Sequence, residues 1–311
     1  MSRHLISIHD LTAAEVAGLF RLSVDVKANP SKYENHMHRK TLAMIFEKSS
    51  TRTRVSFEVG MAQMGGHALF LSSRDIQLGR GEPISDTAKV LSRYVNGIMA
   101  RTFAHQTVTD LAKFGTVPVI NGLTDELHPC QALVDYFTLI EVFGSLEALR
   151  GRRIAYIGDG NNMVHSLMFG ASKVGMDIAV ASPKGYEVNP QYAELARQDA
   201  AAAGTQVILT NDPAEAVKGA SAVYTDVWAS MGQEAEQQER IKAFKGFTVD
   251  SALMSHAQKD AVFLHCLPAH RGEEVSAEVC DGPQSRIYDE AENRLHVQKA
   301  IMLWLMAGVG I

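Results

Sequence analysis

The sequence is short of the features that mark secreted, membrane and metal-binding proteins. Its 311 residues include only three cysteines, Cys130, Cys266 and Cys280, which are far apart and form no C-x-x-C pair. This spacing argues against a disulfide framework and favours a reducing compartment. No apolar run reaches the length of a membrane span, and no apolar signal-peptide core follows the N-terminus. We therefore expect a cytoplasmic protein without a membrane partner.

An excess of one charge sign is also missing. The 30 basic and 35 acidic residues leave a net charge of −5. We therefore expect no nucleic-acid partner, and any anion site must be local. His36 and His38 are the only close pair among twelve histidines. They lack the three or four ligands that a zinc site needs, so we expect no metal.

What the sequence does contain is an alternation of short apolar runs with helix-patterned segments, which indicates parallel α/β sheets. The chain is long enough for two domains, each with its own core. We expect the boundary in a connecting helix that begins near Pro129 and ends near Phe143. The predicted domains are 1–143 and 144–290. The apolar helix over 293–306 is expected to pack back onto the first domain and to add about 291–311 to it. Strands are expected at 41–46, 67–71, 97–100 and 117–121, and then at 153–157, 177–181, 206–209, 222–225 and 261–264.

The segment Ser50-Thr51-Arg52-Thr53-Arg54 lies between the first expected strand and a helix over 55–64. Ser and Thr are common N-caps, and a helix N-terminus offers unsatisfied N–H groups and a partial positive charge. Together with two arginines, these groups suit a phosphate, although an ordinary N-cap with surface arginines is the alternative. Arg101 ends another expected strand. Because ligands gather at the carboxyl ends of parallel strands, we expect Arg101 at the same site.

The turn Gly158-Asp159-Gly160 contains part of a dinucleotide-binding fingerprint, but the rest is missing. Met163 stands at the position of the third glycine, and the next expected strand ends in Val180-Ala181-Ser182-Pro183 without an acidic residue. We therefore reject a nicotinamide site. Asn161 and Asn162 remain of interest, because an amide can bind a carboxylate and an amino group together.

Two further strand ends carry Asp226 and Cys266. A carboxylate attracts the ammonium form of an amine and can help to take up its proton. A cysteine is more often a small buried apolar residue than a catalyst, and that alternative stays open. At a strand end beside His265, however, Cys266 together with Asp226 predicts a site for a substrate that bears a primary amine.

Four motifs now occur in a fixed order along the chain: Ser50 to Arg54, His128-Pro129-Cys130-Gln131, Asp226 to Gly232, and His265-Cys266-Leu267-Pro268. Together they resemble the ornithine carbamoyltransferases over essentially the whole chain. The first motif is shared by carbamoyltransferases in general, whereas the last two point to ornithine. A protein similar to the aspartate enzymes would carry Thr in place of Cys130 and a Pro-Leu-Pro type of turn at 265–268.

The resemblance implies two α/β domains joined by interdomain helices, assembled as a cytoplasmic homotrimer with active sites at the domain cleft near subunit interfaces. It implies that carbamoyl phosphate and L-ornithine give L-citrulline and phosphate without a metal or an organic cofactor. The catalytic residues it implies are Cys266, Arg101, His128 and Asp226. The carbamoyl phosphate contacts it implies are Ser50, Thr51, Arg52, Thr53, Gln77, Arg101, His128, Gln131, Cys266, Leu267 and Arg294. The ornithine contacts it implies are Asn162, Asp226, Ser230 and Met231.

Three alternatives remain at this level. The protein could transfer a carbamoyl group to another amine, such as putrescine or an N-acylornithine. The rejected nicotinamide oxidoreductase is the second alternative, and a non-catalytic binding protein on the same fold is the third. The short chain without terminal extensions favours a role in arginine synthesis over arginine breakdown.

Overall fold

Two parallel β-sheets organise the chain, each in its own compact unit. The computed structural model describes residues 2–73, 81–229 and 236–311. Unit 1 comprises Met1–Leu133 and Glu292–Ile311, and unit 2 comprises Val134–Ala291. The α/β class and the two parallel sheets expected from the sequence are confirmed.

Unit 1 is built on a sheet with the strand order β2-β1-β3-β4, in which all neighbouring strands are parallel. Phe46 at the end of β1 pairs with Arg101 at the end of β3, so the turn that follows β1 starts beside Arg101. The strands are β1 (Thr41–Phe46), β2 (His67–Ser72), β3 (Gly97–Arg101) and β4 (Val119–Leu123). The helices are α1 (Ala13–Ala28), η1 (Pro30–Tyr33), α2 (Thr51–Gln63), α3 (Ile84–Tyr94) and α4 (His105–Phe114).

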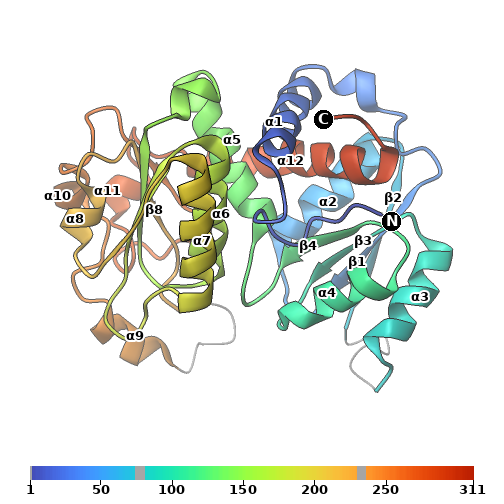
Figure 1. Cartoon of the computed structure of the whole chain (residues 1–311), viewed down its shortest axis with the longest axis horizontal. Helices are drawn as coiled ribbons and strands as arrows, with labels where there is room; N and C mark the ends of the chain where they lie inside the picture. The colour runs from blue at the N-terminus through green and yellow to red at the C-terminus, as the bar shows by residue number, and fades with distance from the viewer. Residues whose placement is uncertain (1, 74–80, 230–235) are drawn as a thin grey trace. The chain divides into compact units, whose positions relative to one another are not determined.

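Two longer helices contribute residues to both units: α5 (Pro129–Phe143) and α12 (Ile287–Ala307). The C-terminal part of α12 packs within unit 1 beside α1 and α2, as expected from the sequence (Figure 1). A Cβ at Gly60 of α2 would come within 2.9 Å of the Met302 side chain, so this glycine permits the close approach. Lys27 Nζ donates to Asn293 Oδ1 over 2.8 Å and joins α1 to the same helix.

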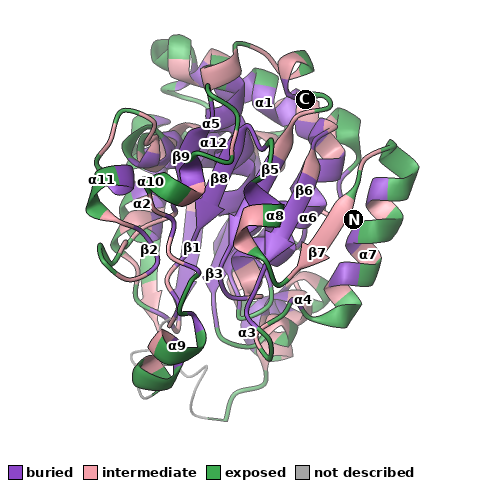
Figure 2. Cartoon of the chain, turned by 90° about the vertical axis from the view of Figure 1, so that its left-hand side faces the viewer, coloured by how far each residue is buried: buried purple, intermediate pink, exposed green. Residues whose placement is uncertain are grey.

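Unit 2 is built on a second parallel sheet with the order β7-β6-β5-β8-β9. Strands β5, β6 and β8 are buried, whereas α7 exposes its outer face (Figure 2). The strands are β5 (Arg153–Ile157), β6 (Asp177–Ala181), β7 (Val207–Thr210), β8 (Ala222–Thr225) and β9 (Val262–Leu264). The helices are η3 (Glu147–Leu149), α6 (Asn162–Val174), α7 (Pro190–Ala203), α8 (Pro213–Val217), α9 (Gln237–Ala243), α10 (Ser251–Met254) and α11 (Ala277–Cys280).

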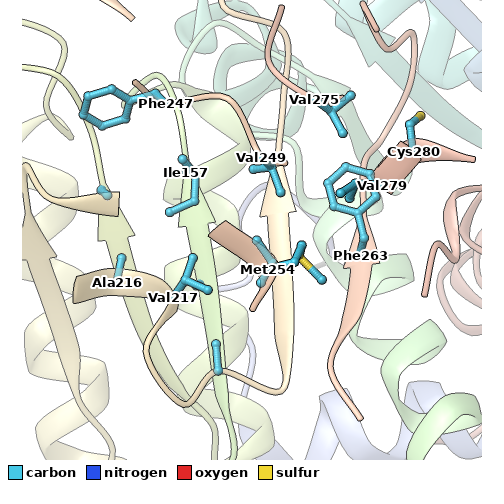
Figure 3. Close-up of a cluster of buried hydrophobic side chains, with 14 of the residues drawn as sticks. Ile157, Ala216, Val217, Phe247, Val249, Met254, Phe263, Val275, Val279 and Cys280 are labelled. Atoms are coloured by element: carbon cyan, nitrogen blue, oxygen red, sulfur yellow. The ribbon is translucent and has the colours of Figure 1, made fainter. Parts of the chain in front are cut away.

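An apolar core lies on one side of this second sheet. Phe263 of β9 and Val279 of α11 are among its buried members, and Cys280 lies beside them with 1% of its surface exposed (Figure 3). Cys280 therefore serves as a small apolar residue. Among the described residues, none of the helices combines the length and apolar character needed to cross a membrane.

Several element boundaries differ from the expectation, and two of these differences have a clear physical cause. Strand β4 begins at Val119 rather than at 117, because Pro118 has no N–H to donate to a neighbouring strand. Helix α12 begins at Ile287 rather than near 293. Its first turn contains Asp289 and Glu290, which a helix N-terminus favours although they carry no apolar pattern.

Candidate functional site

The turn after β1 forms the N-terminus of α2 in unit 1. Ser50 is the N-cap in an extended conformation, and its hydroxyl accepts a hydrogen bond from the Thr53 N–H over 3.3 Å. Thr51 and Arg52 follow in the first helical turn. This cap uses one of the free N–H groups of the helix start, and the remaining N–H groups and the helix dipole favour an anion there.

Buried cationic side chains gather at this helix start. Arg101 and Arg294 expose only 6% and 3% of their surface. Burial lowers the pKa of His128 well below its ordinary value, and the charges of Arg294, Arg101 and Arg52 lower it further. His128 is therefore neutral at pH 7. A potential this positive in a buried setting favours an anionic ligand.

Arg294 connects three segments that are distant in the sequence. Its Nη1 donates to Gln131 Oε1 on α5 over 2.6 Å, and its Nη2 donates to Thr53 Oγ1 on α2 over 3.0 Å. The structure thus brings Thr53, Gln131 and Arg294 together with the arginines around His128. We call this group, from Ser50 to Thr53 with Arg101, His128, Gln131 and Arg294, the cationic cluster.

A second group of polar side chains lies at the strand ends of unit 2. The Cys266 thiol lies 3.1 Å from Asp226 Oδ1, as a donor to this carboxylate oxygen. Burial, and next the charge of Asp226, raises the pKa of Cys266 well above its ordinary value. Cys266 is therefore a neutral thiol that donates a hydrogen bond, and a thiolate nucleophile is disfavoured.

The two asparagines of the glycine-rich turn lie beside this pair. Asn161 is the N-cap of α6, and its Nδ2 donates to Asp226 Oδ2 over 2.9 Å. Asn162 is the first residue of α6. The structure thus joins the turn after β5 with the ends of β8 and β9. We call Asn161, Asn162, Asp226 and Cys266 the carboxylate–thiol cluster.

Two buried carboxylates support the segment around Cys266, and the sequence analysis missed both. Glu274 Oε1 lies 3.2 Å from His265 Nε2, and Glu290 accepts from the His265 N–H over 3.0 Å. His265 Nδ1 accepts from the Leu267 N–H over 2.9 Å, so Nε2 carries the ring proton. Leu267 has a φ of 59°, a conformation that is unusual for this residue type. The sequence offered only the doublet Glu273-Glu274, which has the composition of an exposed turn.

Three predicted site residues, Gln77, Ser230 and Met231, lie outside the described residues. Cys130 is fully buried, and its thiol donates to the Asn121 carbonyl over 3.3 Å. Burial raises the pKa of Cys130 to about 12. This residue of the second motif is therefore structural.

Gly160 of the glycine-rich turn permits a close approach of two backbone segments. A Cβ at this position would come within 2.3 Å of the Glu187 backbone, so the chain before α7 packs directly against the turn.

Among the described residues, two sets of side chains bring potential metal-ligand atoms close together. The ligand atoms of Asp226, His265 and Cys266 lie within 4.8 Å of one another, as do those of His270, Glu273 and Glu274. In the first set both ring nitrogens of His265 already have hydrogen-bond partners. A metal would have to replace one of these bonds and displace the Cys266 proton.

The fold and the two clusters define a class: a two-unit α/β protein with the cationic cluster in one unit and the carboxylate–thiol cluster in the other. Comparison with protein families agrees. Residues 3–141 match the aspartate/ornithine carbamoyltransferase carbamoyl-P binding domain, and residues 150–305 match the aspartate/ornithine carbamoyltransferase Asp/Orn binding domain. The chain belongs to the aspartate/ornithine carbamoyltransferase family, which confirms the resemblance inferred from the motifs.

Within this family, the chain is similar to individual ornithine carbamoyltransferases. The chain is 58% identical over 300 residues to the ornithine carbamoyltransferase of Bacillus subtilis, covering 96% of this chain and 92% of that one. It superposes on the ornithine carbamoyltransferase structure from Pyrococcus furiosus with a TM-score of 0.94 and 52% identity, covering 99% and 98% of the two chains. The anabolic ornithine carbamoyltransferase of Campylobacter jejuni gives a TM-score of 0.91 at 42% identity, with 97% and 98% covered.

Proposed function

We propose that the protein transfers the carbamoyl group of carbamoyl phosphate to the δ-amine of L-ornithine, giving L-citrulline and phosphate. The observation that carries the proposal is the assembly of the distant motif residues into one cationic and one carboxylate–thiol cluster. These are the two chemistries that the two substrates require. The high identity to relatives named ornithine carbamoyltransferases supports the same activity.

The cationic cluster is assigned to carbamoyl phosphate. Ser50, Thr51, Arg52 and Thr53 hold the phosphate at the start of α2, and Arg101 is shared between the phosphate and the carbonyl oxygen. His128, Gln131 and Arg294 contact the carbamoyl end, and Gln77 and Leu267 are further contacts. We assign residues 1–143 with 291–311 to this substrate, in line with the family model that spans 3–141.

The carboxylate–thiol cluster is assigned to ornithine. Asn162, Ser230 and Met231 bind its amino-acid end, and Asp226 attracts its ammonium group. Cys266 and Leu267 flank the reacting amine. Residues 144–290 form this ornithine-binding domain in the proposal.

The chemistry requires a neutral amine and a stabilised oxyanion. An alkyl amine is mostly protonated at pH 7, so a proton must leave before attack, and in this proposal the Asp226 carboxylate accepts it. Attack on the carbonyl creates a tetrahedral oxyanion that Arg101, the Thr53 hydroxyl and neutral His128 stabilise as donors. The phosphate leaves while it is held at the start of α2. No covalent intermediate with Cys266 is needed, since holding both substrates in line supplies much of the acceleration.

We further propose a cytoplasmic homotrimer that works in arginine biosynthesis. Its support is an exposed apolar surface in unit 1: Val55 and Val59 of α2 and Leu69 and Phe70 of the edge strand β2 are between 37% and 49% exposed. Exposed apolar side chains on α2 and β2, two elements that pack together, support an interface between subunits there. The biosynthetic role is supported by the similarity to the anabolic Campylobacter jejuni protein. Sedimentation equilibrium that yields a monomer would contradict the assembly.

Citrulline formation from carbamoyl phosphate tests the activity, with L-ornithine, putrescine, N-acetylornithine and L-aspartate offered in parallel. We expect turnover with L-ornithine alone. Turnover with another amine instead would retain the assignment of the cationic cluster and reject that of the carboxylate–thiol cluster. Folded protein that is inactive with all four amines would contradict the function.

A further inference from the structure

The geometry of the turn after β5 points to a residue that acts through another. We propose that Asn161, held in turn by Tyr156, is a positioning residue that fixes the carboxylate of Asp226 for the amine substrate. The inference rests on the function proposed above. It gives the glycine-rich turn a role within the carbamoyl transfer site.

The orientation of the Asn161 amide is determined by its neighbours. As N-cap of α6, its Oδ1 accepts from the Met163 N–H over 2.9 Å and from the Val164 N–H over 3.4 Å. Backbone N–H groups only donate, so the atom that faces them must be the oxygen. The Tyr156 hydroxyl lies 3.2 Å from the same oxygen and adds a third donor. The Nδ2 group is therefore turned away from the helix.

That Nδ2 group is directed at Asp226. It donates to Asp226 Oδ2 over 2.9 Å. The other oxygen, Oδ1, accepts from the Val227 N–H over 2.9 Å and lies 3.1 Å from the Cys266 thiol. With donors on both oxygens, rotation of the carboxylate breaks at least one charge-assisted hydrogen bond. The remaining lone pairs are thus presented in one direction.

Tyr156 is itself firmly placed. It lies on β5 opposite Tyr224 of β8, and the two rings stack with centroids 6.0 Å apart. Burial raises the pKa of Tyr156 well above its ordinary value, and the charge of Asp226 adds to this effect. The phenol therefore remains a neutral hydrogen-bond donor. The pairing of β5 with β8 thus positions Tyr156, Tyr156 positions the Asn161 amide, and this amide orients Asp226.

The first test separates this role from helix capping. Asn161→Ser retains an N-cap acceptor, since Ser caps about as well as Asn, but it removes the amide donor to Asp226. Asn189→Ser is the matched control, because the exposed Asn189 caps α7 through the Gln191 N–H. We expect Asn161→Ser to lower kcat/KM for L-ornithine about tenfold to a hundredfold, whereas Asn189→Ser changes it less than about twofold. Both variants should melt within a few degrees of each other and bind inorganic phosphate as the wild type does.

Two outcomes count against the inference and remain distinguishable. If the wild type forms citrulline and Asn161→Ser retains the activity of Asn189→Ser, the positioning role is wrong and the proposed function stands. The same holds if Asn161→Ser weakens phosphate binding as much as it weakens ornithine use. A wild type that forms no citrulline would reject both the function and this inference.

The pH dependence of Asn161→Asp supplies a readout that a purely structural role would not move. The introduced carboxyl keeps the cap, repels Asp226 when ionised and donates a hydrogen bond to it when protonated. We expect the ratio of kcat/KM for L-ornithine, variant over wild type, to rise as the pH falls from about 8.5 to about 6. The other titratable groups of this region, Asp159, Tyr156, Tyr224 and Cys266, are common to both proteins, so a pH effect that they exert equally on both cancels in the ratio. A ratio that is independent of pH would overturn the role.

Tyr156→Phe tests the link between the sheet and the amide. It removes only the hydroxyl that donates to Asn161 Oδ1. We expect a smaller loss in the same direction, about twofold to fivefold in kcat/KM for L-ornithine, because two N–H donors still hold the oxygen. A loss that exceeds that of Asn161→Ser would contradict the proposed order of action.

Discussion

The two clusters of polar side chains have opposite charge, and the pKa of a titratable group is lowered in one and raised in the other. In the cationic cluster, burial together with three arginines lowers the pKa of His128. In the carboxylate–thiol cluster, burial together with Asp226 raises the pKa of Cys266. Burial favours the neutral form in both, and the surrounding charge acts in the same direction. Each cluster therefore keeps its titratable donor neutral and leaves the charge for the substrate.

The two clusters hold a buried charged side chain in a similar way, through hydrogen bonds to neutral groups. Arg294 of the cationic cluster lies between neutral acceptors, Gln131 and the Thr53 hydroxyl. Asp226 of the carboxylate–thiol cluster lies between the donors Asn161, the Val227 N–H and Cys266. In both clusters the partners of these hydrogen bonds are neutral, so these bonds themselves add no opposing charge.

The largest expected effect breaks the cationic cluster. Arg52→Ala removes a full charge at the start of α2 from the phosphate site, and we expect kcat/KM for carbamoyl phosphate to fall about a hundredfold to a thousandfold. Arg21→Ala on the exposed face of α1 is the control, with an expected change below about twofold. The citrulline assay and calorimetry with inorganic phosphate check both variants. Near-normal turnover in folded Arg52→Ala would reject the phosphate assignment.

The next prediction concerns the pH dependence of stability, to which Asp159 and His128 should contribute with opposite signs. Burial raises the pKa of Asp159 to about 6, although Arg240 lies 3.1 Å away and opposes the shift. The native state then holds this proton more tightly than the unfolded chain does. The contribution of Asp159 to the free energy of unfolding should rise by roughly 2–3 kcal/mol as the pH falls from about 7 to about 4.

The contribution of His128 to the free energy of unfolding changes with the opposite sign, because the pKa of His128 is lowered in the native state. Its contribution falls as the pH drops below about 6.5, at no more than about 1.4 kcal/mol per pH unit.

Urea unfolding from pH 7 to pH 4 measures these slopes. Asp159→Asn should lack the stabilisation that Asp159 gives the wild type at low pH. His128→Gln should lack the destabilisation that His128 gives the wild type at low pH. The two difference curves should therefore have opposite signs. Curves of the same sign, or flat curves for both variants, would show that the environments of Asp159 and His128 are wrongly described.

The smallest expected effect compares two cysteines of unit 2, the partly buried Cys266 and the buried Cys280. Cys266→Ala removes the donor to Asp226 and should lower kcat/KM for L-ornithine about tenfold, the size of one hydrogen bond to a charged group. Cys280→Ala deletes a sulfur from the apolar core shown in Figure 3 and should cost about 1–2 kcal/mol of stability with kcat/KM unchanged. The inverse result, in which Cys280→Ala loses activity and Cys266→Ala keeps it, would show that Cys266 is not the functional cysteine.

Much of the fold and part of the site were predictable because their signals are local. Apolar runs define the strands, and Thr12 with Glu15 has the local sequence pattern of a capping box, which the structure forms at the start of α1. Strand ends indicated Arg101, Asp226 and Cys266, since the carboxyl ends of parallel strands are where ligands gather. The first turn of α12 was missed because it has acidic residues where the expectation looked for an apolar pattern.

The sequence by itself determined the elements, the family resemblance and the chemical groups at the strand ends, because each depends on neighbours within a few residues. The tertiary structure decided which of these groups meet. Arg294 reaches Thr53 across 241 positions, Asn161 reaches Asp226 across 65, and Glu274 lies buried against His265 rather than in solvent. Such pairs depend on strand register and helix packing, which no local pattern specifies. For the same reason the neutral states of His128 and Cys266 became evident only once their burial and charged neighbours were known.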